Sequence, residues 1–261
     1  KTGADTALTG RDSFVGLKGS FGTVSFGRHA GPYKGTNLDP FIATTLEARN
    51  GGGQSSGGFG HAGFISDTIK YTNKFGAVKF SALTTAGNDE NGDSGDTQIA
   101  LDYKGGPLRV VAATSTNKEA DGTNDEKRTK LGAQYKVAGW KFTAQTESTK
   151  DYTPGTYGRF DNVILATQNG VEFLLALPLS ANTKKTNVGD VYFTMLMAEY
   201  TMGKNTISAK IATEDYKDLD AENDVTMIAL THKFSKKTRA WIGIHSAELE
   251  DIESSVTSLG L

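Results

Sequence analysis

The sequence predicts an all-β protein, and more closely an antiparallel transmembrane β-barrel. Three observations predict it: apolar and polar residues alternate along short segments, hairpins return about every 32 residues, and connections are sorted by length. Composition agrees, because 37% hydrophobic residues with 31 glycines in 261 residues is little for a conventional core of this size. No proline-rich or charged linker divides the chain, so residues 1–261 are expected to form a single barrel domain.

Alternation with a period of two is clearest in three segments. In TQIALDYK, from Thr97 to Lys104, threonine, isoleucine, leucine and tyrosine share one face, while glutamine, alanine, aspartate and lysine share the other. The segments RTKLGAQYKV (Arg128–Val137) and WKFTAQTE (Trp140–Glu147) follow the same rule. Successive side chains of a strand point to opposite faces, so each segment predicts a strand with one apolar and one polar face.

A repeat of hairpins accounts for the longer-range pattern. An aromatic residue precedes each of several short turns, at spacings of 32, 32, 65 and 34: these are Tyr71, Tyr103, Tyr135, Tyr200 and Phe234. The gap of 65 has its midpoint at Gln168, and the Asn169-Gly170 pair that follows is a strong hairpin signal. We therefore expect a sixth hairpin there, whose turn lacks only the aromatic.

The connections alternate between these short turns and long polar segments such as GNDENGDSGD, NKEADGTNDEK and EDYKDLDAEND. Barrels of the outer membrane have this arrangement: an apolar face toward lipid, a polar face toward an aqueous lumen, short periplasmic turns, long outer loops and aromatic girdles. The aromatic residues are thus expected to form the periplasmic girdle. Counting from Asp12 gives about fourteen strands of about ten residues, the length that spans a membrane.

Several other classes are excluded or disfavoured by the residues. A net charge of -2 leaves no basic footprint for nucleic acid, and the absence of cysteine removes disulfides and thiolate metal sites. The four histidines lack metal-ligand spacing, and no serine lies in a G-x-S-x-G turn, so we expect no metal, no cofactor and no catalytic residues. The longest apolar run, Val171–Leu179, is about half of a membrane helix.

Three stretches carry a resemblance to a known family. RDSFVGLKGSFGTVSFGRH (Arg11–His29) resembles the fourth and fifth strands of the Gram-negative trimeric porins of the neisserial and proteobacterial general type. DTIKYTNKFGAVKFSALTT (Asp67–Thr85) resembles the strands after that family's constriction loop, and DVTMIALTHKFSKKTRAWIGIHSAE (Asp224–Glu248) is similar to its penultimate hairpin.

The resemblance implies a barrel of 16 strands. The roughly fourteen strands counted in this sequence, together with about four strands of the family that are not found in it, would instead give 18. The hairpin at Asn169-Gly170 is the candidate insertion. By this resemblance we expect the chain to open near the family's fourth strand and to lack the family's N-terminal strands and last strand.

The resemblance also implies a pore constriction. The glycine-rich loop of residues 30–60 is expected to fold into the barrel, although the sequence alone equally allows an exposed, flexible loop. In such porins basic wall residues face acidic loop residues and sort ions. The candidate constriction residues are Arg28, Lys70, Lys79 and Arg109 on the wall and Asp39 and Glu47 on the loop; Arg128, Lys130 and Lys141 also share the polar face by alternation. For each, a solvated side chain away from the narrowest point is the alternative.

By resemblance, the protein is a non-enzymatic homotrimeric porin in the outer membrane of a Gram-negative bacterium, passing small hydrophilic solutes and ions by passive diffusion. Membrane lipids and lipopolysaccharide are its expected partners. The excess of basic over acidic residues on the polar faces predicts a modest anion preference. A structural or partner-sheathing barrel without open-pore transport remains the alternative function, and a soluble β-sandwich the alternative fold.

Overall fold

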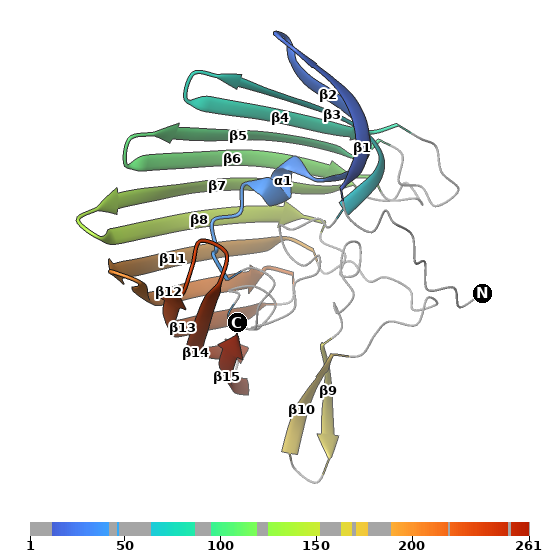
Figure 1. The fold of residues 1–261 in the computed structure, drawn as a ribbon. Coiled ribbons are helices and arrows are strands. Elements are labelled where there is room, and N and C mark those ends of the chain that lie inside the picture. The colour runs from blue at the N-terminus through green and yellow to red at the C-terminus, as the bar shows by residue number, and fades with distance from the viewer. Residues whose placement is uncertain are drawn as a thin grey trace.

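A computed structural model describes residues 12–41, 46, 64–86, 95–118, 125–151, 189–218, 220–248, 255 and 257–260, and the backbone alone of 163–168, 171–176, 249, 252–254 and 256. The main feature is one long, curved antiparallel sheet with a single short helix, α1 (Pro32–Gly35), in front of it (Figure 1). Within these residues no helix has the length and apolar character needed to cross a membrane.

The large sheet has 13 strands, and each strand pairs with its neighbour in the chain except where β9 and β10 are passed over. Most of the strands have eight to 13 residues, which suits tilted strands that cross a bilayer. The strands are β1 (Ser13–Gly19), β2 (Gly22–Ala30), β3 (Phe64–Phe75), β4 (Val78–Thr85), β5 (Thr97–Gly105), β6 (Leu108–Asn117), β7 (Glu126–Val137), β8 (Trp140–Lys150), β11 (Val191–Met202), β12 (Asn205–Tyr216), β13 (Ala221–Lys233), β14 (Arg239–Leu249) and β15 (Ile252–Gly260).

The sixth hairpin expected at Asn169-Gly170 is present. It consists of β9 (Val163–Gln168) and β10 (Val171–Ala176), which pair with each other in a sheet of their own. β8 pairs directly with β11, from Trp140↔Tyr200 to Thr149↔Val191. The hairpin is therefore an insertion between two adjacent strands of the large sheet, as the strand count suggested.

The connections are sorted between the two ends of the sheet. Short turns join β1–β2, β3–β4, β5–β6, β7–β8, β11–β12 and β13–β14, and Figure 1 shows several of them gathered at one end. The expectation of a long loop over EDYKDLDAEND is wrong, because β12 continues to Tyr216 and β13 begins at Ala221. The two strands stay paired up to Tyr216↔Ala221, which turns most of that polar segment into strand.

The alternation predicted from the sequence defines the two faces of the sheet. In β5, for example, Gln98 is 1% exposed while the adjacent Ile99 is 46% exposed. The polar face carries α1 and the segment after it, and we call it the inner face; the other is the outer face. β7 and β8 show the same division, with Lys130 and Glu147 on the inner face and Leu131 and Phe142 on the outer one.

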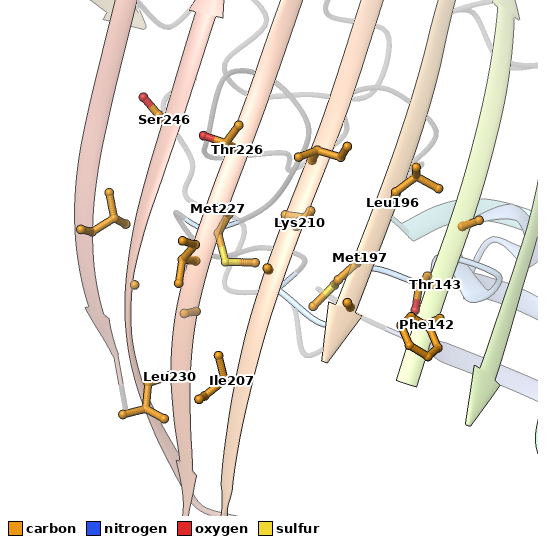
Figure 2. Close-up of a pocket in the computed structure, with 18 of the residues that line it drawn as sticks. Phe142, Thr143, Leu196, Met197, Ile207, Lys210, Thr226, Met227, Leu230 and Ser246 are labelled. Carbon is orange, nitrogen blue, oxygen red and sulfur yellow. The ribbon is translucent and has the colours of Figure 1, made fainter. Parts of the chain in front are cut away.

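The outer face is apolar over a large area. A broad hollow of about 1270 Å³ extends over the outer sides of β7, β8 and β11–β15, and its labelled outer residues include Phe142, Leu196, Ile207 and Leu230 (Figure 2). Exposed apolar side chains on a single sheet face are unfavourable in water and suit contact with hydrocarbon. The sheet therefore has the two-faced character of a transmembrane barrel wall.

Candidate functional site

The candidate site is the inner face together with the chain segment that crosses it. After β2 the chain begins α1 at Pro32, a residue favoured at the first helical position because it needs no hydrogen bond from its nitrogen. α1 lies against the inner sides of β4, β5 and β6. The described segment buries four large side chains almost completely against the wall: Tyr33, Leu38, Phe41 and Leu46.

Tyr33 is held by side chains from three strands. Its backbone N–H donates to Gln98 Oε1 of β5 at 3.0 Å, and its hydroxyl donates to Glu147 Oε2 of β8 at 3.0 Å. Lys130 Nζ of β7 donates to the Tyr33 carbonyl at 3.1 Å and lies 4.2 Å from the centre of its ring. Lys130 Nζ is also 3.7 Å from Glu147 Oε1, so the two buried charges compensate each other.

Leu38 continues the docking along β7 and β8. Its N–H donates to Gln145 Oε1 at 2.9 Å, and Gln134 Nε2 donates to its carbonyl at 3.4 Å. A Cβ atom placed at Gly132 would lie only 2.7 Å from Leu38 Cδ1, so glycine at this position lets the segment approach the wall. Wall side chains therefore replace the water that this backbone would otherwise bind.

Asp39 forms the second charged anchor. Its Oδ2 atom is 2.9 Å from Lys210 Nζ of β12, and the two side chains are 2% and 0% exposed. Lys210 also donates to the carbonyl of Leu46 and lies 5.6 Å from the Phe41 ring centre. Phe41 and Leu46 pack in one cluster with Met197, Met227 and Ala229 of the wall. Charge and apolar packing thus fix the same part of the segment.

A third set of buried charged residues, after Lys130–Glu147 and Lys210–Asp39, lies toward the loop end of β6 and β7. Arg128 Nε is 2.5 Å from Glu126 Oε1, and Asn117 Nδ2 donates to the same oxygen at 2.8 Å. Paired, hydrogen-bonded charges are the form in which ions are tolerated away from water. The inner face beneath the segment is therefore charged but locally compensated.

The structure places Arg28 and Lys70 at the root of the segment. Lys70 Nζ donates to the carbonyl of Ala30 at 2.9 Å, directly before α1. Arg28 donates from Nη1 to Ser66 Oγ at 2.6 Å, and it lies on the strand face opposite to its buried neighbour His29. Among the described residues neither basic group is ion-paired with Asp39.

The remaining candidate constriction residues lie away from the Asp39–Lys210 ion pair. Lys79 and Arg109 are inner-face residues near the short turns, and Arg109 forms two bonds to Asp102, of 2.9 and 3.0 Å. Lys79 is exposed and stands opposite Asp102 in the ladder. The expectation for Glu47 lies outside the described residues. Of the two loop carboxylates, Asp39 alone can therefore be placed, and it contacts Lys210.

Lys210 is not among the constriction residues predicted from the sequence, although alternation along its strand indicates its inward position. In ISAKIATE, Ser208 and Lys210 alternate with apolar Ile207 and Ile211, which places the lysine on the inner face. Glu147 was assigned to the polar face, but nothing in the sequence indicates its contact with Tyr33. Such contacts depend on how the segment lies across the wall.

The predicted aromatic girdle follows the turn end of the outer face. Tyr103, Tyr135 and Phe234 are exposed, whereas Tyr71 donates from its hydroxyl to the carbonyl of Phe21 at 2.7 Å. The Tyr200 ring lies 4.8 Å from the ring of Trp140. All five lie within a few residues of a short turn, where interfacial aromatics are expected.

A wall that is apolar outside and charged inside, crossed by a segment pinned to its inner face, defines the class of transmembrane β-barrels with an inward-folded loop. The family model described as Gram-negative porin matches residues 1–251. The chain therefore belongs to the Gram-negative porin family, whose place is the outer membrane.

Solved structures agree with the fold. An anion-selective porin from Comamonas acidovorans is 19% identical, with a TM-score of 0.63 over 92% of this chain and 67% of that chain. Salmonella typhi OmpF in complex with daunomycin is 15% identical, with a TM-score of 0.66 over 90% of this chain and 70% of that one. A porin refined at 1.8 Å resolution is 16% identical, with a TM-score of 0.61 and coverage of 94% and 79%. No curated protein matches.

Proposed function

We propose that the protein forms a water-filled channel for the passive diffusion of small hydrophilic solutes and ions across the outer membrane, without catalysing a reaction. The observation that carries the proposal is the polar inner face, on which a pinned segment leaves charged residues such as Lys79, Lys104 and Lys136 exposed. A wall built only to enclose a packed core would bury apolar side chains there.

A modest anion preference is the second part of the proposal. Basic residues outnumber acidic ones on the inner faces near the short turns, and we assign the sorting of ions to the inner-face residues Lys70, Lys79 and Arg109, opposed by Asp39 and Glu47. One similar solved structure is called anion-selective, which agrees in direction. Rings of basic side chains favour anions in aqueous pores.

The assembly we propose is a homotrimer whose remaining outer surface meets lipid and lipopolysaccharide. A solved structure of Vibrio cholerae OmpT with a TM-score of 0.58 is called a trimer form. The apolar outer side chains of the described strands would contact either a neighbouring subunit or lipid. Cross-linking in detergent, followed by gel electrophoresis without heating, checks the trimer.

Planar lipid bilayers test the channel. Stepwise conductance increases on insertion are expected, and a protein that inserts without steps would instead support a structural or partner-sheathing barrel. In a tenfold salt gradient the reversal potential should report anion preference. Replacing Lys70 and Lys79 by alanine should move the reversal potential toward cation preference, while cation selectivity in both the unsubstituted protein and the variants would overturn the assignment.

A further inference from the structure

Basic residues of the inner face gather at the short-turn end of the strands. Four hairpins have two basic residues directly opposite each other next to the turn: Lys74↔Lys79, Lys104↔Arg109, Lys136↔Lys141 and Lys233↔Arg239. Lys18 of β1 and Lys204, Lys236 and Lys237 of the turns add to them. We call these residues the basic ring.

Like charges placed directly opposite each other destabilise a sheet. The fold therefore gains nothing from repeating this pair in hairpin after hairpin. Only some of the charge is compensated: Asp102 binds Lys104 and Arg109, and Glu199 binds Lys141. Lys74, Lys79 and Lys136 form no ion pair with any residue that the structure describes.

The basic ring faces the interior of the barrel and not the membrane. Its paired residues alternate with outer-face aromatics: Tyr103 precedes Lys104, and Tyr135 precedes Lys136. Anionic headgroups would meet lysines on the outer face, so the orientation favours a solute in the pore mouth over a lipid.

Part of the basic ring encloses a cavity. Five basic residues line a space of about 430 Å³ together with Pro40 and Phe41 of the inserted segment: Lys204, Lys233, Lys236, Lys237 and Arg239. One carboxylate, Glu199, also lines this space, and it is paired with Lys141. Arg239 Nη2 donates to the Pro40 carbonyl at 3.3 Å, which joins this side of the mouth to the segment. The space is large enough for a small multivalent anion.

The opposite end of the sheet carries the opposite charge. The described residues nearest the long loops include many carboxylates: Asp96, Asp125, Glu126, Asp190, Glu214, Asp215, Asp218, Asp220, Glu222, Asp224 and Glu248. Basic residues lie at this end as well, among them Lys118, Lys127, Arg128, Lys150 and Lys217, but the carboxylates outnumber them. The loop end is thus acidic on balance, whereas the short-turn end is basic. Clefts lined by one sign of charge concentrate counter-ions about 10-fold or more.

We propose that the basic ring is a binding site for small polyvalent anions of the phosphate and pyrophosphate class, located at the periplasmic mouth, where the short turns of outer-membrane barrels lie. Its electrostatics make the channel asymmetric, because a polyvalent anion that arrives from the short-turn side meets the site first. The electrical readout rests on the proposed channel function, whereas the binding itself does not.

Single-channel recording with inorganic pyrophosphate, added to one chamber at a time at constant ionic strength, tests the asymmetry. Half-block from the short-turn side is expected at about a 10-fold lower concentration than from the loop side. Orientation can be read by a membrane-impermeant thiol reagent on a Lys118→Cys variant, since Lys118 follows β6 at the loop end and the chain has no other cysteine.

Two matched double variants locate the site. K74Q/K136Q removes two ring charges that form no ion pair with a described residue, relieves like-charge repulsion and should reduce the asymmetry. K127Q/K150Q removes an opposed lysine pair at the loop end and on the outer face, so it should leave the asymmetry intact. Equal block from both sides, or equal effects of the two variants, would overturn the proposal.

Calorimetric titration of pyrophosphate into the detergent-solubilised protein measures binding independently of channel conductance. Binding should weaken about 10-fold as salt rises from about 0.05 to 0.2 M, because it is electrostatic, and it should weaken in K74Q/K136Q but not in K127Q/K150Q. Absence of binding refutes the basic ring as a site. Binding without conductance would instead refute the proposed channel and leave the site standing.

Discussion

Replacing Lys210 by methionine should loosen the inserted segment from the wall. Lys210 Nζ lies 2.9 Å from Asp39 Oδ2, and both side chains are buried. At an effective dielectric constant of about 20, charges at that distance attract by about 6 kcal/mol. Removing each ion from water costs several kcal/mol, so the intact pair contributes little net stability, while a single remaining charge retains the full cost.

The expected loss for Lys210→Met is therefore about 3–5 kcal/mol. Methionine keeps much of the aliphatic length beside Phe41, so the loss reports charge more than packing. The double variant Lys210→Met/Asp39→Asn removes both charges and should recover most of the stability. The loss is limited by the free energy with which the segment binds to the wall. If Lys210→Met costs more than that free energy, the segment detaches and the free energy of unfolding of the sheet falls no further.

Two measurements check this reasoning: the denaturant midpoint of the detergent-folded protein, and the rate at which a protease cleaves near residues 37–46. In Lys210→Met the denaturant midpoint should fall and the cleavage rate should rise. In the double variant both should return toward the values of the unsubstituted protein. Lys217→Met serves as the control, because Lys217 pairs with Asp215 at the exposed loop end of β12 and should leave both readouts unchanged. Unchanged cleavage and midpoint in Lys210→Met, or a double variant no better than the single one, would refute it.

Two further substitutions test the two faces of the wall. Gly132→Val should cost about 1–3 kcal/mol and raise protease cleavage of the segment, because its Cβ would meet Leu38 Cδ1 at 2.7 Å; Gly35→Ala, whose Cβ would have nothing within 4 Å, is the matched control for the denaturant midpoint. Ile228→Arg should cost about 2–4 kcal/mol and reduce assembly into vesicles, because this side chain is 66% exposed on the apolar face. Ile228→Val should cost less than about 1 kcal/mol, and equal assembly of the two would argue against lipid contact there.

The two faces of the wall were predictable because side-chain direction in a strand depends only on position along the chain. Gln98 and Ile99 already separate correctly in the sequence, as do Lys130 and Leu131. The turns were predictable for the same local reason, down to the hairpin between Gln168 and Val171. That this hairpin pairs only with itself could not be read from its sequence, since a hairpin's own residues do not specify its neighbours.

The contacts of the inserted segment were not predictable, because they join residues far apart in the chain. Alternation places Lys130 on the inner face, but it cannot show that Tyr33, 97 residues away, covers the ammonium group. The resemblance suggested Arg28 and Lys70 as opponents of Asp39, whereas the described ion pair joins Asp39 to Lys210. Loop placement is decided by several weak contacts at once, and none of them leaves a periodic signal.

Charge compensation differs along the axis of the barrel, and this bears on where ions are sorted. Beneath the segment each buried cation has a carboxylate close by, as in Lys130–Glu147 and Lys210–Asp39. Near the short turns Lys74 and Lys136 have no such partner among the described residues. Paired charges largely cancel at the distance of a passing ion, whereas unpaired charges in a pore mouth act within about a Debye length of 10 Å at 0.1 M salt. We therefore expect substitutions at the basic ring to shift reversal potentials more than substitutions of the buried pairs.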